Sequence, residues 1–378
     1  MSSIGERLAN LRTAQRLTQR ELAERAEVSV DLVCKLEQGR KHTARLSSLT
    51  KLARALDADL AALVSDPVAL QTPNEDAGIL AIRRVLTPAT TAEPTGGDQA
   101  QLLADAWAAY WRGDYDTLGV MLPTLIAHAS VPAQRAEALN IATSLLVHSG
   151  KQDLAYLAVR QAIQAAENAP DPLLRVAMVT TMAWAFLVAG RPEDGYKVAE
   201  AVADEAEPAS LSRADPVRLA VWGNVVVKMA TSAARAHQPG RARDALRLAG
   251  AAAAALDTDA MHFHSPFGPS LVTMQAVDVE LQDDNYGAAL QAAGKMPPDA
   301  RLPLAARARH LTDVAFAQTR LGRDADAEKT LLGVERMAPE WITHQSWPRT
   351  IVAELVERER RVRTPHLRGL AQRLGVPA

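Results

Sequence analysis

Cysteine and aromatic residues are scarce in the sequence, and both shortages narrow the possible folds. The one cysteine, Cys34, excludes a disulfide within the chain and a zinc site built from several cysteines. Aromatic residues make up 4% of the chain, whereas alanine and leucine, which favour helices, supply most of the hydrophobic 48%. No segment has the alternation of Val, Ile, Thr and Tyr that is typical of strands. The sequence therefore predicts an all-α protein.

Long apolar runs are also missing. No run of about 18 apolar residues suggests a membrane span, and the first residues, MSSIGERLAN, lack the apolar core of a signal peptide. We therefore expect a cytoplasmic protein. Because the net charge is −2, any nucleic-acid site must be a local one. Residues 1–66 carry eleven Lys and Arg against nine Asp and Glu, and they are the more basic part.

The usual sequence signatures of an enzyme are missing as well. We find no phosphate-binding glycine loop, no nucleophile elbow, no metal-ligand cluster and no convincing acid–base pair. We therefore expect no catalytic activity, no cofactor and no bound metal. A length of 378 residues suggests two or three domains.

Residues 1–66 contain clear helix start and stop signals. Thr18, with Glu21 three places later, forms a capping box that predicts a second helix over residues 19–26. Ser29 offers the N-cap of a third helix, and Gly39 suits its C-terminal end. Two helices joined by so tight a turn form a helix-turn-helix.

The flanking segments complete a five-helix unit. Apolar residues at helical spacing predict a first helix over residues 4–16 and a fourth over 46–56, and "DADLAALV" (57–64) adds a short fifth. The strings "IGERLANLRTAQRLTQRELAERAEVS", "KLEQGR" and "LSSLTKLARALDAD" then resemble the XRE family, the Cro and lambda-repressor type of DNA-binding domain. The family usually has Gly in the turn where Glu27 stands. Gly suits a left-handed backbone, so we expect strain or a modified turn at Glu27.

The resemblance implies a DNA-binding face on the third helix, opposite the side expected to face the core. In the family this face enters the major groove. Lys35 would donate to guanine, Asp31 would accept from cytosine, and Val30 would contact a thymine methyl. The expected base contacts are Val30, Asp31, Cys34 and Lys35. The expected phosphate contacts are Thr18, Gln19, Ser29, Arg40, Lys41, His42 and Arg45.

Simpler roles stay open for the same residues. Asp31 is also a favourable charge at a helix N-terminus, and Lys35 is also an ordinary solvated side chain. Cys34 is either a filler or a redox switch. The whole unit could bind protein instead of DNA.

Residues 67–100 read as a linker, in which "DAGILAIRRVL" allows one helix and "TPATTAEPTGGDQ" predicts a flexible tether. Over residues 101–378 a short landmark recurs between apolar helical stretches, and each copy ends on Leu, Ala or Gly. The landmarks begin at Gly113, Gly150, Gly190, Gly240, Asp284 and Gly322. This pattern resembles the tetratricopeptide repeat (TPR), whose unit of about 34 residues is a pair of antiparallel helices. We expect a TPR-like superhelix, with an irregular helical bundle as the alternative.

In a TPR superhelix, the first helix of each pair lines a concave face. Counting back from the landmarks gives tentative ligand contacts at Asn140, Ser144, Trp184 and Asp278. Amide groups there suit a peptide, and Trp184 can stack on a small molecule. Each residue could equally be ordinary surface or core. Further positions expected on this face are His148, Thr180, Met274, Thr312 and Arg320.

Two other stretches are less informative. "MHFHSPFGPS" (261–270) holds two histidines without an obvious third metal ligand, so we expect an inter-repeat loop. The basic segment "RERRVRTPHLRGLAQRLGV" (358–376) is expected to be a solvated terminal helix, or else to contact phosphate or a partner.

Together the resemblances imply a transcription regulator of the helix-turn-helix and TPR type, similar to regulators of Gram-positive bacteria and actinobacteria. Such a protein would bind a double-stranded operator as a homodimer, because one recognition helix covers only a few base pairs. Its TPR-like domain would dimerise and sense a peptide or a small molecule. The alternative is an adaptor whose repeats recruit a protein partner while DNA binding is secondary.

Overall fold

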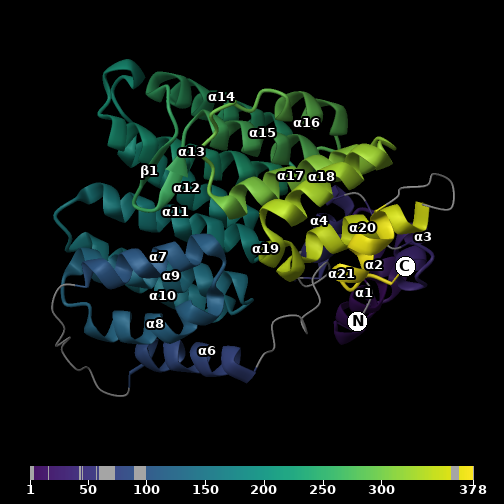
Figure 1. Cartoon of the computed structure of the whole chain (residues 1–378), viewed down its shortest axis with the longest axis horizontal. Helices are drawn as coiled ribbons and strands as arrows, with labels where there is room; N and C mark the ends of the chain where they lie inside the picture. Colours follow the sequence, from purple (N-terminus) through teal and green to yellow (C-terminus); the bar gives the residue numbers. More distant parts are fainter. Residues whose placement is uncertain are drawn as a thin grey trace.

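The computed structural model describes residues 4–15, 17–41, 44, 46–56, 58, 73–88, 99–358 and 366–377. Within these ranges the regular structure is helical apart from one two-stranded hairpin (Figure 1). The prediction of an all-α protein is confirmed. None of the described helices is long and apolar enough to cross a membrane.

Four helices of the N-terminal unit lie within the described residues: α1 (Ile4–Ala14), α2 (Gln19–Arg25), α3 (Val30–Glu37) and α4 (Leu46–Ala55). The predicted capping box begins α2, because the Thr18 hydroxyl accepts from the Glu21 N–H while the Glu21 carboxylate accepts from the Thr18 N–H. Ser29 caps α3 by accepting a hydrogen bond from the Leu32 N–H. The fifth helix predicted over residues 57–64 lies outside the described residues except for Ala58.

The core of this unit lies between α1, α2, α3 and α4. Leu8, Leu22, Val33 and Leu36 are fully buried in it. Gly5 lets α1 cross α3 closely, since a Cβ atom at this position would overlap the Leu36 carbonyl oxygen. The inward side of α3 is therefore fixed by packing, and its other side is left for contacts outside the unit.

The rest of the chain begins with α6 (Pro73–Leu86), the helix expected in the linker, which packs on α8 and α10. Six helical hairpins follow. The pairs are α7 (Ala100–Arg112) with α8 (Tyr115–His128), α9 (Pro132–His148) with α10 (Gln152–Glu167), α11 (Pro172–Val188) with α12 (Pro192–Ala206), α13 (Pro216–Arg235) with α14 (Pro239–Leu256), α15 (Pro269–Gln282) with α16 (Tyr286–Ala293), and α17 (Leu304–Arg320) with α18 (Asp324–Met337). A 3₁₀ turn η2 (Leu211–Arg213) precedes α13, and α19 (Pro339–His344), α20 (Ser346–Arg358) and α21 (Leu367–Arg373) end the fold.

Each hairpin turn contains one residue with a left-handed backbone, and four of these residues are glycines that the sequence singled out. Their φ values lie between 69° and 80°. The other two turns use Asp284 (φ 55°) and His237 (φ 57°). The landmark placed at Gly240 is therefore wrong by three residues: Pro239 begins α14, Gly240 lies inside the helix, and His237 makes the turn.

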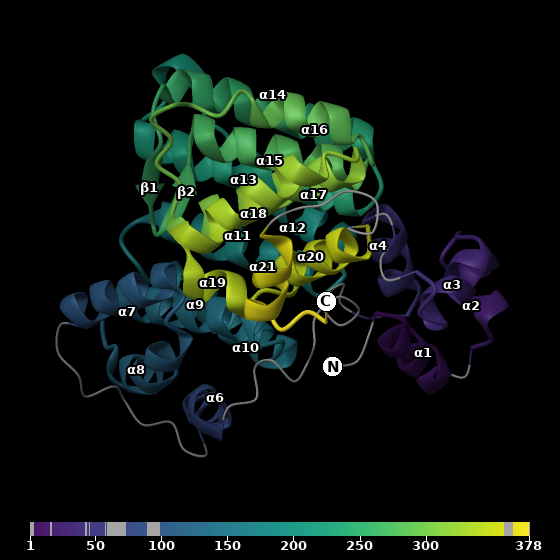
Figure 2. The same cartoon turned by 45° about the vertical axis from the view of Figure 1, so that its right-hand side comes forward.

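The first helices of successive pairs lie side by side, so that α9, α11, α13, α15 and α17 each pack on the first helix before them. The stack curls far enough for α17 to contact α7, and Figure 2 shows the second helices α14 and α16 on its outside. This is the TPR-like superhelix that the repeats predicted. Its inner face is lined by the first helices, as expected.

The stretch expected to be an inter-repeat loop is a β-hairpin, which corrects that prediction. Strand β1 (Ala260–His262) pairs antiparallel with β2 (Ser265–Phe267). Phe263 and His264 form its turn, both with positive φ (47° and 56°), as a type I′ turn requires. Gly223 on α13 provides the space for Phe267, because a Cβ atom at residue 223 would overlap the Phe267 ring.

Candidate nucleic-acid interface and inner cavity

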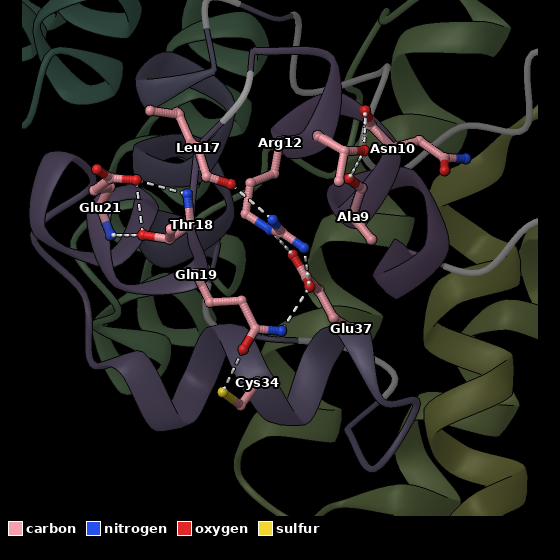
Figure 3. Close-up of polar contacts among 10 residues, drawn as sticks. Ala9, Asn10, Arg12, Leu17, Thr18, Gln19, Glu21, Cys34 and Glu37 are labelled. Carbon is pink, nitrogen blue, oxygen red and sulfur yellow. Dashed lines mark hydrogen bonds and ion pairs between the residues drawn. The ribbon is translucent and has the colours of Figure 1, made fainter.

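A chain of polar contacts joins α1, α2 and α3 (Figure 3). Arg12 donates to both carboxylate oxygens of Glu37, at 2.7 and 2.9 Å, and also to the Leu17 carbonyl at 2.7 Å. Gln19 donates to the same carboxylate at 2.7 Å, and its own side-chain oxygen accepts from the Cys34 thiol at 2.9 Å. The orientation of α3 relative to α2 is therefore held by hydrogen bonds as well as by the core.

The Arg12–Glu37 pair is largely shielded from solvent, with 15% and 6% of the two side chains exposed. Its hydrogen bonds to Glu37 raise the pKa of Arg12, although burial acts in the opposite direction. The guanidinium therefore stays charged, and a bidentate pair of this kind fixes direction as well as distance. Removing one partner of such a pair would leave the other as an uncompensated, mostly buried charge.

The outward face of α3 is open. Val30, Asp31 and Lys35 are exposed, and the repeats do not cover them. Lys35 forms an ion pair with Asp31 at 2.8 Å, with 51% and 70% of the side chains exposed. Such a pair contributes at most about 1 kcal/mol, so a duplex can displace it at little cost. Cys34 is half-buried and bonded to Gln19, so its thiol is directed to α2.

The expected phosphate contacts divide into four groups. Gln19 stands alone, because its half-buried side chain is bonded to Glu37 and Cys34 inside the unit. The side chains of Thr18 and Ser29 are engaged in capping, while both residues remain exposed at helix N-termini where backbone N–H groups favour anions. Arg40 and Lys41 are exposed just after α3. His42 and Arg45 lie outside the described residues.

A groove of about 770 Å³ runs beside α3 and brings these groups together with α4. Its lining includes Ser29, Asp31, Lys35, Arg40 and Lys41, together with Ser48 and Lys51 of α4. The sequence reading did not assign a contact to α4. The available signal was the helical periodicity that places Ser48 and Lys51 away from the leucines of that helix.

Glu27 lies at the rim of the same groove. Its φ is 50°, so of the two alternatives expected at Glu27, strain or a modified turn, the structure has the strained left-handed backbone. The Glu27 carboxylate lies 3.6 Å from the Lys51 ammonium. This contact ties the turn between α2 and α3 to α4, although both side chains remain partly exposed.

The N-terminal unit rests on the repeats through α4 and the segment before it. Arg54 pairs with Glu193 of α12 at 2.7 Å, and Arg320 of α17 donates to the Ala44 carbonyl at 2.7 Å. Trp347 of α20 packs against the core of the N-terminal unit. In Figure 2, α1, α2 and α3 lie on the far side of α4 from the repeats.

A second hollow of about 190 Å³ lies on the concave face of the repeats. Three of the tentative ligand residues, Asn140, Ser144 and Trp184, line it, as do Thr180 and Met274. The hairpin closes one side with His264, Ser265 and Pro266, which the sequence reading did not foresee. The first helices thus place these side chains together as expected.

The fourth tentative ligand residue, Asp278, does not line this cavity. It is 6% exposed and accepts two hydrogen bonds from Arg235, at 2.7 and 3.0 Å. Burial disfavours its charged form, but the guanidiniums of Arg235 and Arg309 lower the pKa of Asp278 below its usual value. Two other expected concave residues are also used internally: Thr312 is buried and donates to the Ala308 carbonyl, and Arg320 bonds to Glu354.

Comparison with known proteins gives a family match for the N-terminal unit alone. Residues 3–64 match the model of a helix-turn-helix domain. No curated protein sequence matches the chain.

Three solved structures resemble the fold loosely. PlcR of Bacillus thuringiensis, solved with the peptide PapR7 and DNA, is 11% identical over 78% of this chain and 95% of that one, with a TM-score of 0.39. BtubC of P. vanneervenii is 14% identical over 64% and 91%, with a TM-score of 0.38. Apo ComR of Streptococcus vestibularis is 15% identical over 82% and 97%, with a TM-score of 0.31. Likeness at this level does not decide between functions. The chain therefore has a helix-turn-helix domain at residues 3–64, which the family model identifies, followed by a domain of helical repeats.

Proposed function

We propose that the protein is a DNA-binding transcription regulator that reads a duplex with the outward face of α3. One observation carries the proposal: Val30, Asp31 and Lys35 are exposed on a helix whose opposite side is locked by packing and by the Arg12–Glu37 pair. A rigid helix with an open, mixed polar and apolar face is what major-groove recognition needs.

The charges around α3 support the same proposal. Lys35, Arg40, Lys41 and Lys51 line the groove beside it, whereas the acidic residues there are Asp31 and Glu27. Phosphate contacts from such cations supply most of the non-specific affinity and set the register on the duplex. The overall charge of −2 then keeps this attraction confined to one part of the molecule.

We further propose that the regulator acts as a homodimer and that its repeat domain binds an effector. One α3 helix reads only a few base pairs, so a twofold operator would double the specific contacts. The concave cavity is the site on the repeats that suits an effector best, because apolar and aromatic walls there converge with a few polar groups. An effector regulates only if it binds two arrangements of the protein with different affinity.

The test is selection of bound duplexes from a random pool, followed by footprinting with the full-length protein. A twofold footprint is expected. Lys35→Ala should then lose discrimination at one base position in each half-site, at a cost of about 1–3 kcal/mol. Lys197→Ala, which alters an exposed lysine on α12, is the matched control and should leave affinity unchanged. Weak, sequence-blind binding by the wild type would instead favour the adaptor.

A further inference from the structure

The walls of the concave cavity are unusually aromatic for a protein with so few aromatic residues. Trp107, Tyr110 and Trp111 of α7 line it together with Trp184 of α11. His264 at the hairpin turn lies over Trp107, with ring centroids 4.2 Å apart and planes 11° from parallel. This pair is already stacked, whereas Trp111 and Trp184 in the lining are partly exposed. Their flat rings favour a planar ligand, because aromatic rings stack on one another.

Two polar atoms in the same walls lack a hydrogen-bond partner. Asn140 is 3% exposed and its side-chain oxygen is unpaired; Trp107 is 4% exposed and its indole N–H is unpaired. Buried polar groups are nearly always hydrogen-bonded, and each unmade bond costs about 1–3 kcal/mol. Because both residues line the cavity, an acceptor on a bound molecule would satisfy the Trp107 N–H, and a donor carried by that molecule or by a bound water would satisfy the Asn140 oxygen.

The formal charge in the lining is positive. Among the described residues that line the cavity there is no Asp or Glu, and Lys228 of α13 is the cation. Asp278, whose charge acts on Lys228 from outside the lining, is held by Arg235, and Glu137 lies 3.6 Å from the lining residue His264. A negatively charged group is therefore the complement that Lys228 lacks within the cavity.

The volume limits the size of the ligand. A cavity of about 150 Å³ in another protein holds one benzene molecule. The present cavity, at about 190 Å³, admits one aromatic ring with a small substituent. An extended peptide of several residues is larger than this volume.

We propose that the concave cavity binds a small planar carboxylate, about one aromatic ring in size, with the ring stacked against the tryptophan walls and the carboxylate on Lys228. The inference rests on the proposed function in one respect: this compound is the effector of the regulator. Its binding would draw α7, α11, α13 and the hairpin together, since each contributes a wall.

The environment of Lys228 makes such binding depend on pH. Burial, with a smaller effect from the positive charge of Arg235, lowers the pKa of Lys228 to about 8, and Asp278 acts in the opposite direction. The ammonium is therefore mostly protonated at pH 7 and loses its proton as the pH rises through about 8. His264 and Tyr110 are the other titratable groups in the lining. Affinity for a carboxylate should fall across that range, whereas affinity for a neutral ring should not.

The experiment is titration of the full-length protein with benzoate, benzamide and benzylamine, which share one ring and differ in charge. Tryptophan fluorescence and calorimetry report binding, since Trp107, Trp111 and Trp184 are three of the six tryptophans in the chain. Saturable binding of benzoate is expected, with benzamide at least about tenfold weaker and no response to benzylamine. Equal binding of all three, or no saturable binding of benzoate up to about 10 mM, would overturn the proposal.

Variants separate the site from its role. Lys228→Met should bind benzoate no better than benzamide, and its affinity for benzoate should not fall above pH 8. Lys228→Arg should keep the preference for benzoate at every pH. Lys329→Met, an exposed lysine on α18, is the matched control and should behave as wild type. If Lys228→Met does not fold, Asn140→Leu, which replaces the unpaired amide in the cavity wall by a larger apolar side chain, should abolish binding of benzoate and of benzamide.

The DNA footprint distinguishes the effector role of the compound from its binding in the cavity. A footprint that changes with benzoate in the wild type but not in Lys228→Met supports the effector role. If benzoate binds but the footprint does not change, the compound is not an effector, although the cavity still binds a carboxylate. No footprint under any condition would refute the proposed function, while calorimetry would still decide whether the cavity takes a carboxylate.

Discussion

Replacing Glu37 by glutamine should weaken the helix-turn-helix domain far more than a surface change of the same chemistry. Glu37 accepts two hydrogen bonds from Arg12 and one from Gln19, and its side chain is 6% exposed. Glutamine keeps the shape of the side chain but loses its charge. The Arg12 guanidinium then lacks its carboxylate partner and keeps the hydrogen bond to the Leu17 carbonyl. Breaking a buried pair from one side costs about 3–5 kcal/mol. Since Arg12 is still 15% exposed, we expect the lower end, about 3 kcal/mol.

The assay is urea unfolding of the full-length protein followed by circular dichroism, with DNA binding measured in parallel. Glu24→Gln is the control, because Glu24 and its partner Arg20 are 71% and 79% exposed and lie 3.8 Å apart. That change should cost less than about 1 kcal/mol. Glu37→Gln should destabilise the N-terminal unit and also lower specific DNA affinity, because Gln19 and Cys34 lose their anchor.

A double variant checks the physical reason. If the loss comes from stranding a buried charge, Arg12→Met combined with Glu37→Met should be more stable than either single change, because two apolar side chains can replace a buried pair. Equal losses for Glu37→Gln and Glu24→Gln would refute the reasoning. So would a double variant whose loss is the simple sum of the two single losses.

Three further outcomes follow from the geometry. Gly5→Ala should cost about 1–3 kcal/mol or more, because its Cβ would overlap the Leu36 main chain, and a variant as stable as wild type in thermal melts would contradict this. Burial lowers the pKa of His310 to about 4 from 6.5, so the unfolded chain binds a proton between these values and the folded protein does not. Relative to His310→Leu, wild type should therefore lose about 3 kcal/mol of stability as the pH falls from about 6.5 to 4, and parallel curves would exclude the effect. Lys51→Ala should make the salt dependence of DNA binding shallower by about 0.9 in a double-logarithmic plot, and an unchanged slope would remove Lys51 from the interface.

The N-terminal helices could be predicted closely because their signals are local. Thr18 and Ser29 begin helices through hydrogen bonds to residues three places on, and such contacts depend only on nearby sequence. The glycine that the family usually has at Glu27 indicates an unusual backbone there but leaves strain and a modified turn as alternatives, and the φ of 50° decides for the strained form. The exposed face of α3 follows from helical periodicity once Val33 and Leu36 are assigned to the core.

The repeat pattern gave the architecture of the second domain but not all of its turns. Four turns contain glycine, which has an evident conformational reason to be there. His237 takes the same left-handed conformation, but histidine is not a residue type that indicates a turn. The sequence pattern therefore points to the nearby Gly240 instead. Asn140, Ser144 and Trp184 reach one cavity because repeat spacing alone fixes which helix face is concave.

Contacts between distant segments could not be predicted in this way. Asp278 has the spacing of a concave residue, yet Arg235, 43 residues earlier, engages it fully. The hairpin at residues 260–267 depends on Gly223, whose missing side chain makes room for Phe267. Lys51 joins the groove beside α3 only through the packing of α4. Each of these contacts joins residues that are far apart in the sequence, and the pattern of a single sequence does not show which distant residues meet.

The contact between α17 and α7 affects how the repeat domain should respond to heating and to truncation. In an open solenoid each unit meets only its neighbours, so losing the last unit costs one interface and the remainder melts gradually. Here the two ends meet, and deleting α17 and α18 would remove an interface from both the first hairpin and the fifth. Thermal melting of this domain should therefore be sharper than that of an open solenoid, and shortening it from one end should also destabilise the other end.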